Sequence, residues 1–115
     1  MQQDCIFCKI AAKTIPVKAV YEDENLIAFP DINPVAPIHL LVIPKKHIAN
    51  ILEVTPEDAV LLGHIMATIP KIAEIAGIAE EGFRTVINTK DNGGQTVYHL
   101  HFHIVGGRFM TWPPG

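Results

Sequence analysis

The sequence predicts an α+β protein: an antiparallel sheet of about five strands, one long helix and a short N-terminal helix. Two observations predict this class, namely short apolar stretches with hairpin-length links and one long helical segment among them. A chain of 115 residues is long enough to bury roughly 65% of its unfolded surface. We therefore expect a single domain over residues 1–115.

The strands are expected where apolar or alternating stretches are bounded by turn residues. An acidic turn at residues 23–25 makes a hairpin of the first two strands. Pro44 stops the third strand, and the prolines within residues 33–37 make the segment before it a rigid loop. The five predicted strands are residues 17–22, 26–29, 40–43, 83–88 and 98–106.

The predicted helices are residues 5–11 and a long helix that begins at Thr55. There a hydroxyl N-cap is followed by a proline and two carboxylates, which are typical of a helix start. The long helix is expected to run to about Ala76, to stop at Gly77, and to be kinked by Pro70. Residues 90–96 are expected to form a glycine-containing loop, and residues 109–115 an irregular tail.

Composition and charge exclude several classes of function. The net charge is −3, and the largest basic cluster is Lys45-Lys46, which argues against extended nucleic-acid binding and a polybasic membrane anchor. The first residues lack a basic region and a long apolar run, so we expect no secretory signal and no transmembrane helix. Two cysteines three residues apart suggest a reducing compartment, and hence the cytoplasm.

Half of the six histidines lie within five residues, as His99, His101 and His103. Their two-residue spacing places the imidazoles on one face of a strand and the apolar residues between them on the other. Residues four apart on a strand are separated by roughly 13 Å, too far for the outer pair to share one metal ion. At most two neighbours are therefore expected to ligate together, which leaves another imidazole for catalysis or ligand binding.

The segment that leads into the histidines contains the paired glycines of Asp91-Asn92-Gly93-Gly94-Gln95-Thr96. In isolation this pattern indicates a turn. Glycines also let backbone N–H groups turn toward an anion, and Gln95 and Thr96 add side-chain donors. A phosphate held by this loop would lie within reach of His101.

Residues 95–108 closely resemble the signature of the histidine-triad (HIT) family, and residues 112–115 resemble the ending of its Hint branch, the purine nucleoside phosphoramidases. Residues 5–10, 29–34 and 41–47 are similar to the other blocks of the family in the same order. The resemblance covers nearly the whole chain and implies a HIT-like fold.

The resemblance implies hydrolysis of adenosine 5′-phosphoramidates or acyl-adenylates through a covalent AMP–histidine intermediate. It makes His101 the nucleophile, Asp31 the ligand of the ribose hydroxyls, and an apolar slot the purine site. The implied catalytic set is His99, His101, His103 and Thr96. The implied nucleotide-binding set is Ile6, Phe7, Phe29, Asp31, Ile32, His39, Asn88, Gly94, Gln95, Thr96, His101 and His103.

The resemblance also implies one structural zinc ion per chain, held by Cys5, Cys8, His47 and His99. Two thiols and two imidazoles make a closed tetrahedral site, which would attach the N-terminal segment to the histidine strand. No organic cofactor is expected. The alternative is that Cys5 and Cys8 are two small buried thiols.

The long helix predicts a homodimer, because residues 59–70 contain no Asp, Glu, Lys or Arg. The stripe expected to cover the sheet is Leu62, Ile65, Met66, Ile69 and Ala73. This leaves an apolar surface on its other faces, at Val60, Leu61, Ala67 and Ile75. In the dimer that the resemblance implies, Trp112 of the tail lies near the partner's active site.

Three other functions remain open from the sequence. The nearest is hydrolysis of dinucleoside polyphosphates, against which the ending Trp112-Pro113-Pro114-Gly115 argues. A non-catalytic nucleotide-binding adaptor would not need the catalytic residues. A metal hydrolase would use the histidine row directly.

Overall fold

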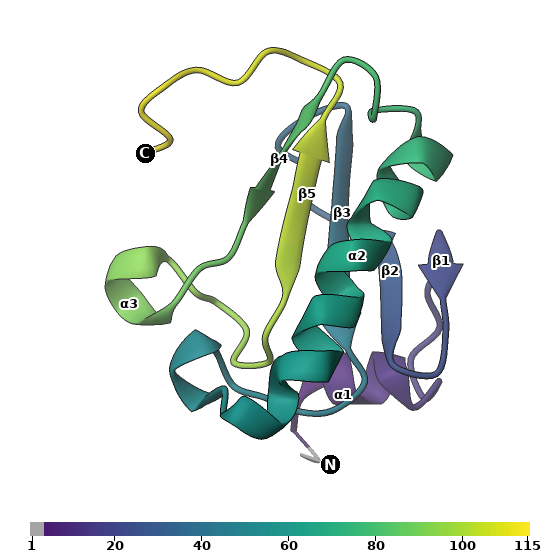
Figure 1. The fold of residues 1–115 in the computed structure, drawn as a ribbon, viewed down its shortest axis with the longest axis vertical. Helices are drawn as coiled ribbons and strands as arrows, with labels where there is room; N and C mark the ends of the chain where they lie inside the picture. The colour runs from purple at the N-terminus through teal and green to yellow at the C-terminus, as the bar shows by residue number, and fades with distance from the viewer. Residues whose placement is uncertain (1–3) are drawn as a thin grey trace.

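The computed structural model describes residues 4–115 and contains one five-stranded antiparallel sheet (Figure 1). The strand order is β1-β2-β3-β5-β4, so β3 and β5 are paired on both sides in the middle of the sheet. The predicted fold class is confirmed. The strands are β1 (Tyr21–Glu22), β2 (Leu26–Pro30), β3 (Ile38–Pro44), β4 (Phe83–Val86) and β5 (Phe102–Gly106).

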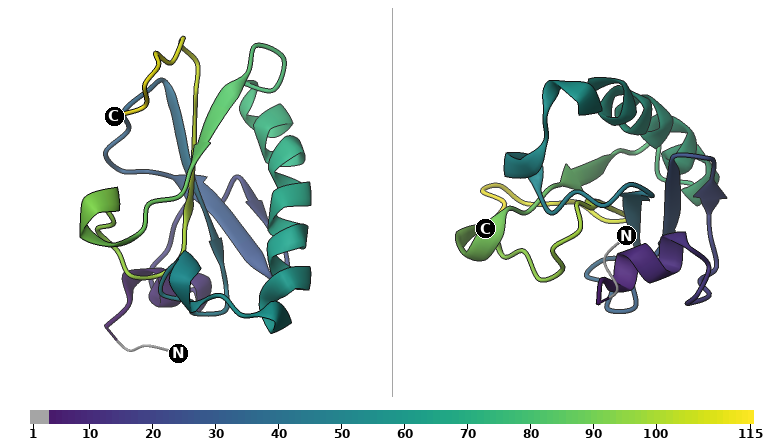
Figure 2. Two further views of the ribbon diagram at one scale, coloured as in Figure 1. Left: turned by 60° about the vertical axis from the view of Figure 1, so that its left-hand side comes forward. Right: turned by 90° about the horizontal axis from the view of Figure 1, so that it is seen from below.

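Helices lie on both faces of this sheet. The long helix α2 (Ala59–Ala76) crosses one face, and the short helix α1 (Ile6–Ala11) lies on the other (Figure 2). Two single 3₁₀ turns, Ile51–Glu53 and Pro56–Asp58, precede α2. Gly77 ends α2 in the left-handed conformation (φ 77°), as expected for a glycine after the last helical turn.

Three predicted elements differ from the structure. The first strand is only Tyr21–Glu22, because in the described backbone its pairing with β2 ends at Val20. The histidine strand begins at Phe102, not at residue 98. Before it, the N–H of Leu100 donates to the carbonyl of Ile48 (2.6 Å) and leaves the sheet ladder.

The third difference is at residues 90–96, where an irregular loop was expected. Here the chain forms a short helix, α3 (Lys90–Gly93), which ends at Gly94 with φ 78°. The glycine pair therefore makes a helix end as well as a turn, because Gly94 adopts a left-handed conformation that other residues rarely take.

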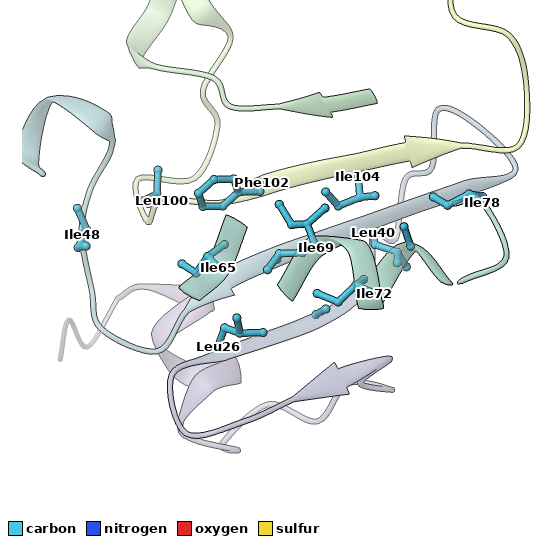
Figure 3. Close-up of a cluster of buried hydrophobic side chains, with 13 residues drawn as sticks. Leu26, Leu40, Ile48, Ile65, Ile69, Ile72, Ile78, Leu100, Phe102 and Ile104 are labelled. Carbon is cyan, nitrogen blue, oxygen red and sulfur yellow. The ribbon is translucent and has the colours of Figure 1, made fainter. Parts of the chain in front are cut away.

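The main core fills the space between α2 and the sheet (Figure 3). Ile65, Ile69 and Ile72 of α2 lie at positions i, i+4 and i+7, so they form one stripe that packs on Phe102 and Ile104. The stripe expected from the sequence was wrong at one position, Met66. Its side chain is 54% exposed because one residue turns the helix by about 100° from the stripe at Ile65.

By length and composition alone, the segment Pro56–Ala76 is apolar enough to cross a membrane. One side of this helix packs into the core of the sheet, as the core helix of a soluble protein also does. Its remaining apolar residues lie at the surface.

A second, smaller apolar cluster lies between α1 and the opposite face of the sheet. It consists of Phe7, Ile10, Ile27, Phe29, Leu41 and Ile43. His103 of β5 pairs in register with Leu41 of β3, which places the last histidine of the row on the face covered by α1.

Candidate active site and metal cluster

The three histidines point to the α1 face, and the residues between them point to the α2 face. Leu100, Phe102 and Ile104 all belong to the core under α2. The predicted alternation of faces is therefore confirmed, although only His103 lies within the regular strand. The imidazoles divide into two separate clusters with potential metal ligands, one containing His99 and the other containing His103.

The first cluster gathers Cys5, Cys8, His47 and His99, whose ligand atoms all lie within 4.8 Å of one another. The Nδ1 atom of His99 is 3.3 Å from Cys5 Sγ, 3.6 Å from Cys8 Sγ and 3.2 Å from His47 Nδ1. Cys8 Sγ is 3.2 Å from His47 Nδ1. In tetrahedral zinc sites, bond lengths near 2.1–2.3 Å put neighbouring ligand atoms roughly 3.3–3.8 Å apart, so these side chains fit such an ion.

Hydrogen bonding prepares His99 for this role. Its Nε2–H donates to the carbonyl of Pro44 at 2.8 Å, which leaves the lone pair on Nδ1, the atom that faces the cysteines. Burial lowers the pKa of His99 to about 4, so its ring is neutral at pH 7. Burial raises the pKa of the Cys5 thiol, and a bound cation would favour its thiolate. The chemistry of the cluster therefore fits a structural zinc ion.

His101 lies between the two clusters and has its two ring nitrogens in different surroundings. Nδ1 is 2.7 Å from the carbonyl oxygen of His99, so this nitrogen carries the proton. Burial lowers the pKa of His101, an effect that this hydrogen bond partly offsets. Within the described residues, no buried side-chain nitrogen lacks a partner, so the unpaired Nε2 of His101 is accessible. The ring is thus a neutral imidazole with an available lone pair.

The second cluster contains Asp31, His39 and His103. The Nε2 atom of His39 is 2.9 Å from His103 Nδ1 and 3.4 Å from Asp31 Oδ2. The other nitrogen of His39, Nδ1, accepts the backbone N–H of Val35 at 3.2 Å. Both ring nitrogens of His39 are therefore bonded within the protein. Burial, together with the neighbouring imidazoles of His101 and His39, lowers the pKa of His103 to about 4.

A cavity of about 430 Å³ lies beside His101 and His103. Its walls are mostly apolar, and Phe7 and Phe29 meet edge to face there at 5.9 Å. Asp31 and Thr96 add the polar groups. Nine residues of the predicted nucleotide and catalytic sets line it or its rim: Ile6, Phe7, Phe29, Asp31, Ile32, Thr96, His101 and His103 directly, and His39 through its contact with His103.

Three predicted nucleotide-binding residues lie outside the lining of this cavity: Asn88, Gly94 and Gln95. The carboxamide of buried Gln95 is occupied by the backbone. Its Oε1 accepts the N–H of Lys90, and its Nε2 donates to the carbonyls of Ala49 and Val97. Gln95 therefore fixes the loop that carries Thr96.

Trp112 and two groups of unexpected residues complete the site. Trp112 is 82% exposed on the C-terminal tail. Sequence reasoning missed the cavity wall made by Ile15, Pro16 and Val17, which reaches the site only because the chain folds back after α1. It also missed the backbone N–H of Val35, since a main-chain donor has no signature in the sequence.

Comparison with known proteins connects this site to one family. The family described as "Scavenger mRNA decapping enzyme C-term binding" matches residues 4–112. An uncharacterized HIT-like protein of Synechococcus elongatus is 56% identical over the full length of both chains. Protein HitA of Neisseria gonorrhoeae is 53% identical over 103 residues, which cover 90% of this chain and 95% of HitA.

Solved structures agree with the sequence comparison. A HIT family hydrolase from Legionella pneumophila Philadelphia 1 has a TM-score of 0.94 and 54% identity, covering 97% of this chain and 100% of that one. A histidine triad protein from Clostridium difficile has a TM-score of 0.92 and 45% identity, covering 96% of each chain. The chain belongs to the HIT family.

Proposed function

We propose that this protein hydrolyses adenosine 5′-phosphoramidates or acyl-adenylates through a covalent AMP–His101 intermediate. The observation that carries the proposal is the state of His101. Its proton is held on Nδ1 by the His99 carbonyl, and the accessible Nε2 lone pair adjoins the cavity. A neutral imidazole of this kind is a good nucleophile at pH 7. Within the family, the ending Trp112-Pro113-Pro114-Gly115 favours the Hint branch.

The reaction has two steps. In the first, the Nε2 lone pair forms a bond to the α-phosphorus, and the bond from phosphorus to the leaving nitrogen or oxygen breaks with its electron pair. A leaving amine takes up one proton, and the carbonyl of His99 stabilises the positive charge that develops on the ring. In the second step, water attacks phosphorus, the electron pair returns to Nε2, and AMP and one proton are released.

The cavity suits the nucleotide half of such a substrate. Phe7 and Phe29 provide flat apolar walls for a purine. The carboxylate of Asp31 is available to accept ribose hydroxyls. His103 and the exposed Thr96 lie on the phosphate side, where positioned donors typically contribute about 10²–10⁴-fold to the rate.

We further propose one structural zinc ion on Cys5, Cys8, His47 and His99. When bound, the ion would link α1 to the segment that carries the nucleophile. The ring of His99 is therefore assigned to this cluster, and its carbonyl to His101. Two thiols kept reduced for a metal fit a reducing compartment, and we place the protein in the cytoplasm.

The assembly proposed for the active protein is a homodimer. Val60, Met66 and Ile75 leave apolar side chains exposed along α2, and β4 is an unpaired edge of the sheet. A groove of about 310 Å³ between α2 and β5 continues this surface. A two-fold pairing of the α2 helices and β4 edges would bury all three features, and would bring Trp112 to the partner's leaving-group pocket.

The test is turnover of an AMP–amine conjugate alongside a diadenosine polyphosphate. We expect the wild-type protein to favour the conjugate and to yield an acid-sensitive AMP adduct on His101 by mass spectrometry. His101→Gly should abolish turnover and keep AMP affinity within about threefold, since the purine and ribose contacts remain.

His64→Asn is the matched control. His64 lies on α2, where its Nε2 pairs with Asp23 at 2.6 Å, outside the cavity. This variant should turn over the conjugate like the wild type. Near wild-type turnover by His101→Gly would rule out the mechanism, and preference for the polyphosphate would place the chain in the other branch of the family.

A further inference from the structure

A chain of hydrogen bonds leads from the loop before β3 to His103. The backbone N–H of Val35 donates to His39 Nδ1 at 3.2 Å, and His39 Nε2 lies 2.9 Å from His103 Nδ1. Neither the composition of the loop nor the histidine row indicates this arrangement.

The direction of the chain follows from its first member. A backbone amide only donates, so His39 Nδ1 carries a lone pair and the ring proton is on Nε2. From there the proton has two acceptors, His103 Nδ1 at 2.9 Å and Asp31 Oδ2 at 3.4 Å. The shorter contact is with His103, whose Nδ1 therefore accepts, and whose own proton lies on Nε2.

We propose that the Val35 amide and His39 are positioning groups that hold His103 as its Nε2-protonated tautomer, with the donor available to the α-phosphate and the leaving atom. This inference rests on the proposed function, because that reaction gives the donor something to bind. No described residue accepts a hydrogen bond from His103 Nε2, and the ring lines the cavity. The opposite tautomer would turn a lone pair toward the anionic phosphate oxygens.

The loop that supplies the amide is itself fixed by the segment after β5. Arg108 Nη2 donates to the carbonyl of Val35 at 3.1 Å, so both polar groups of this residue are bonded. Gly107 adopts φ +91°, and a Cβ there would lie 2.9 Å from Cβ of Pro37. Only glycine permits this close approach of the two segments.

The side chain of Val35 takes no part in this arrangement, since it is 62% exposed. Replacing the side chain and removing the N–H are therefore separable changes. Val35→Ala keeps the amide, and Val35→Pro removes it. Pro34 already precedes this position, so the extended conformation that a following proline favours lies on a residue with fixed φ.

The first experiment measures the tautomers directly in the full-length wild-type protein. Long-range ¹H–¹⁵N correlation spectra at pH 7 distinguish protonated from unprotonated ring nitrogens. We expect Nε2–H and a bare Nδ1 for both His39 and His103. A proton on Nδ1 of either ring would overturn the proposal, whether or not any variant folds.

The second experiment compares Val35→Pro with Val35→Ala on two substrates. An amine leaves poorly without a donor, whereas a carboxylate leaves readily. Val35→Pro should therefore lower kcat about 10- to 100-fold for the AMP–amine conjugate and less than about threefold for an acyl-adenylate, with AMP affinity unchanged. Val35→Ala should match the wild type on both substrates.

The outcomes separate this proposal from the proposed function. If the wild type turns over both substrates and Val35→Pro behaves like Val35→Ala, the positioning role is wrong and the proposed function stands. If the wild type cleaves neither substrate, the proposed function is wrong, and the spectra alone decide the tautomer of His103.

Discussion

Removing zinc from the cysteine–histidine cluster should lower thermal stability strongly and leave the nucleophile intact. The ligands come from α1 and from two segments far along the chain, at His47 and His99, so an ion would hold these parts together. A ligand at about 1,000 times its Kd contributes about 4 kcal/mol to the free energy of unfolding. For a domain of this size, about 4 °C in Tm per kcal/mol gives a loss of about 15 °C.

The assay is differential scanning calorimetry with metal analysis of protein purified without chelator. We expect one equivalent of zinc and a Tm loss of about 15 °C on adding chelator. Cys8→Ser should lose both the metal and the chelator response. Lys9→Ala, a neighbouring change in α1, should keep both. Well below one equivalent of zinc, or a Tm that chelator does not move, would refute the reasoning.

Three further predictions concern stability and assembly. Burial keeps the pKa of His103 near 4, against 6.5 for an ordinary histidine, so the unfolded chain binds more protons between these values. Its contribution to stability is complete above about pH 6.5 and is lost as the pH falls toward 4; urea unfolding should show this, and His103→Gln should flatten it. Ile72→Ala should lower the free energy of unfolding by about 2–5 kcal/mol, because the side chain is fully buried under α2. Val60→Glu with Met66→Glu should halve the mass by light scattering from that of a wild-type dimer without unfolding the chain, since both side chains are exposed.

The sequence predicts the fold class well because its signals are local. Alternation marks the strands, and the start and stop residues of the long helix lie within a few residues of Thr55 and Gly77. Strand ends are less well predicted. Whether residues 98–101 continue a strand depends on the partner that Leu100 finds, which is the distant carbonyl of Ile48.

The two-cluster division of the histidines was also predictable, because it follows from distances along a strand. His99 and His103 are too far apart to share an ion, and the structure places them in separate clusters. The apolar wall from Ile15 to Val17 was not predictable, since nothing in these residues indicates that the chain turns back over the cavity.

The least predictable feature of the site is what each imidazole does with its second nitrogen. His99 gives its Nε2 proton to the carbonyl of Pro44 and keeps Nδ1 for the cysteines. His101 gives its Nδ1 proton to the carbonyl of His99 and keeps Nε2 for the cavity. The two rings are identical in the sequence, and backbone groups give them opposite tautomers. Their separation into a metal ligand and a nucleophile is therefore a property of the folded main chain, and it should survive any substitution that leaves those two carbonyls in place.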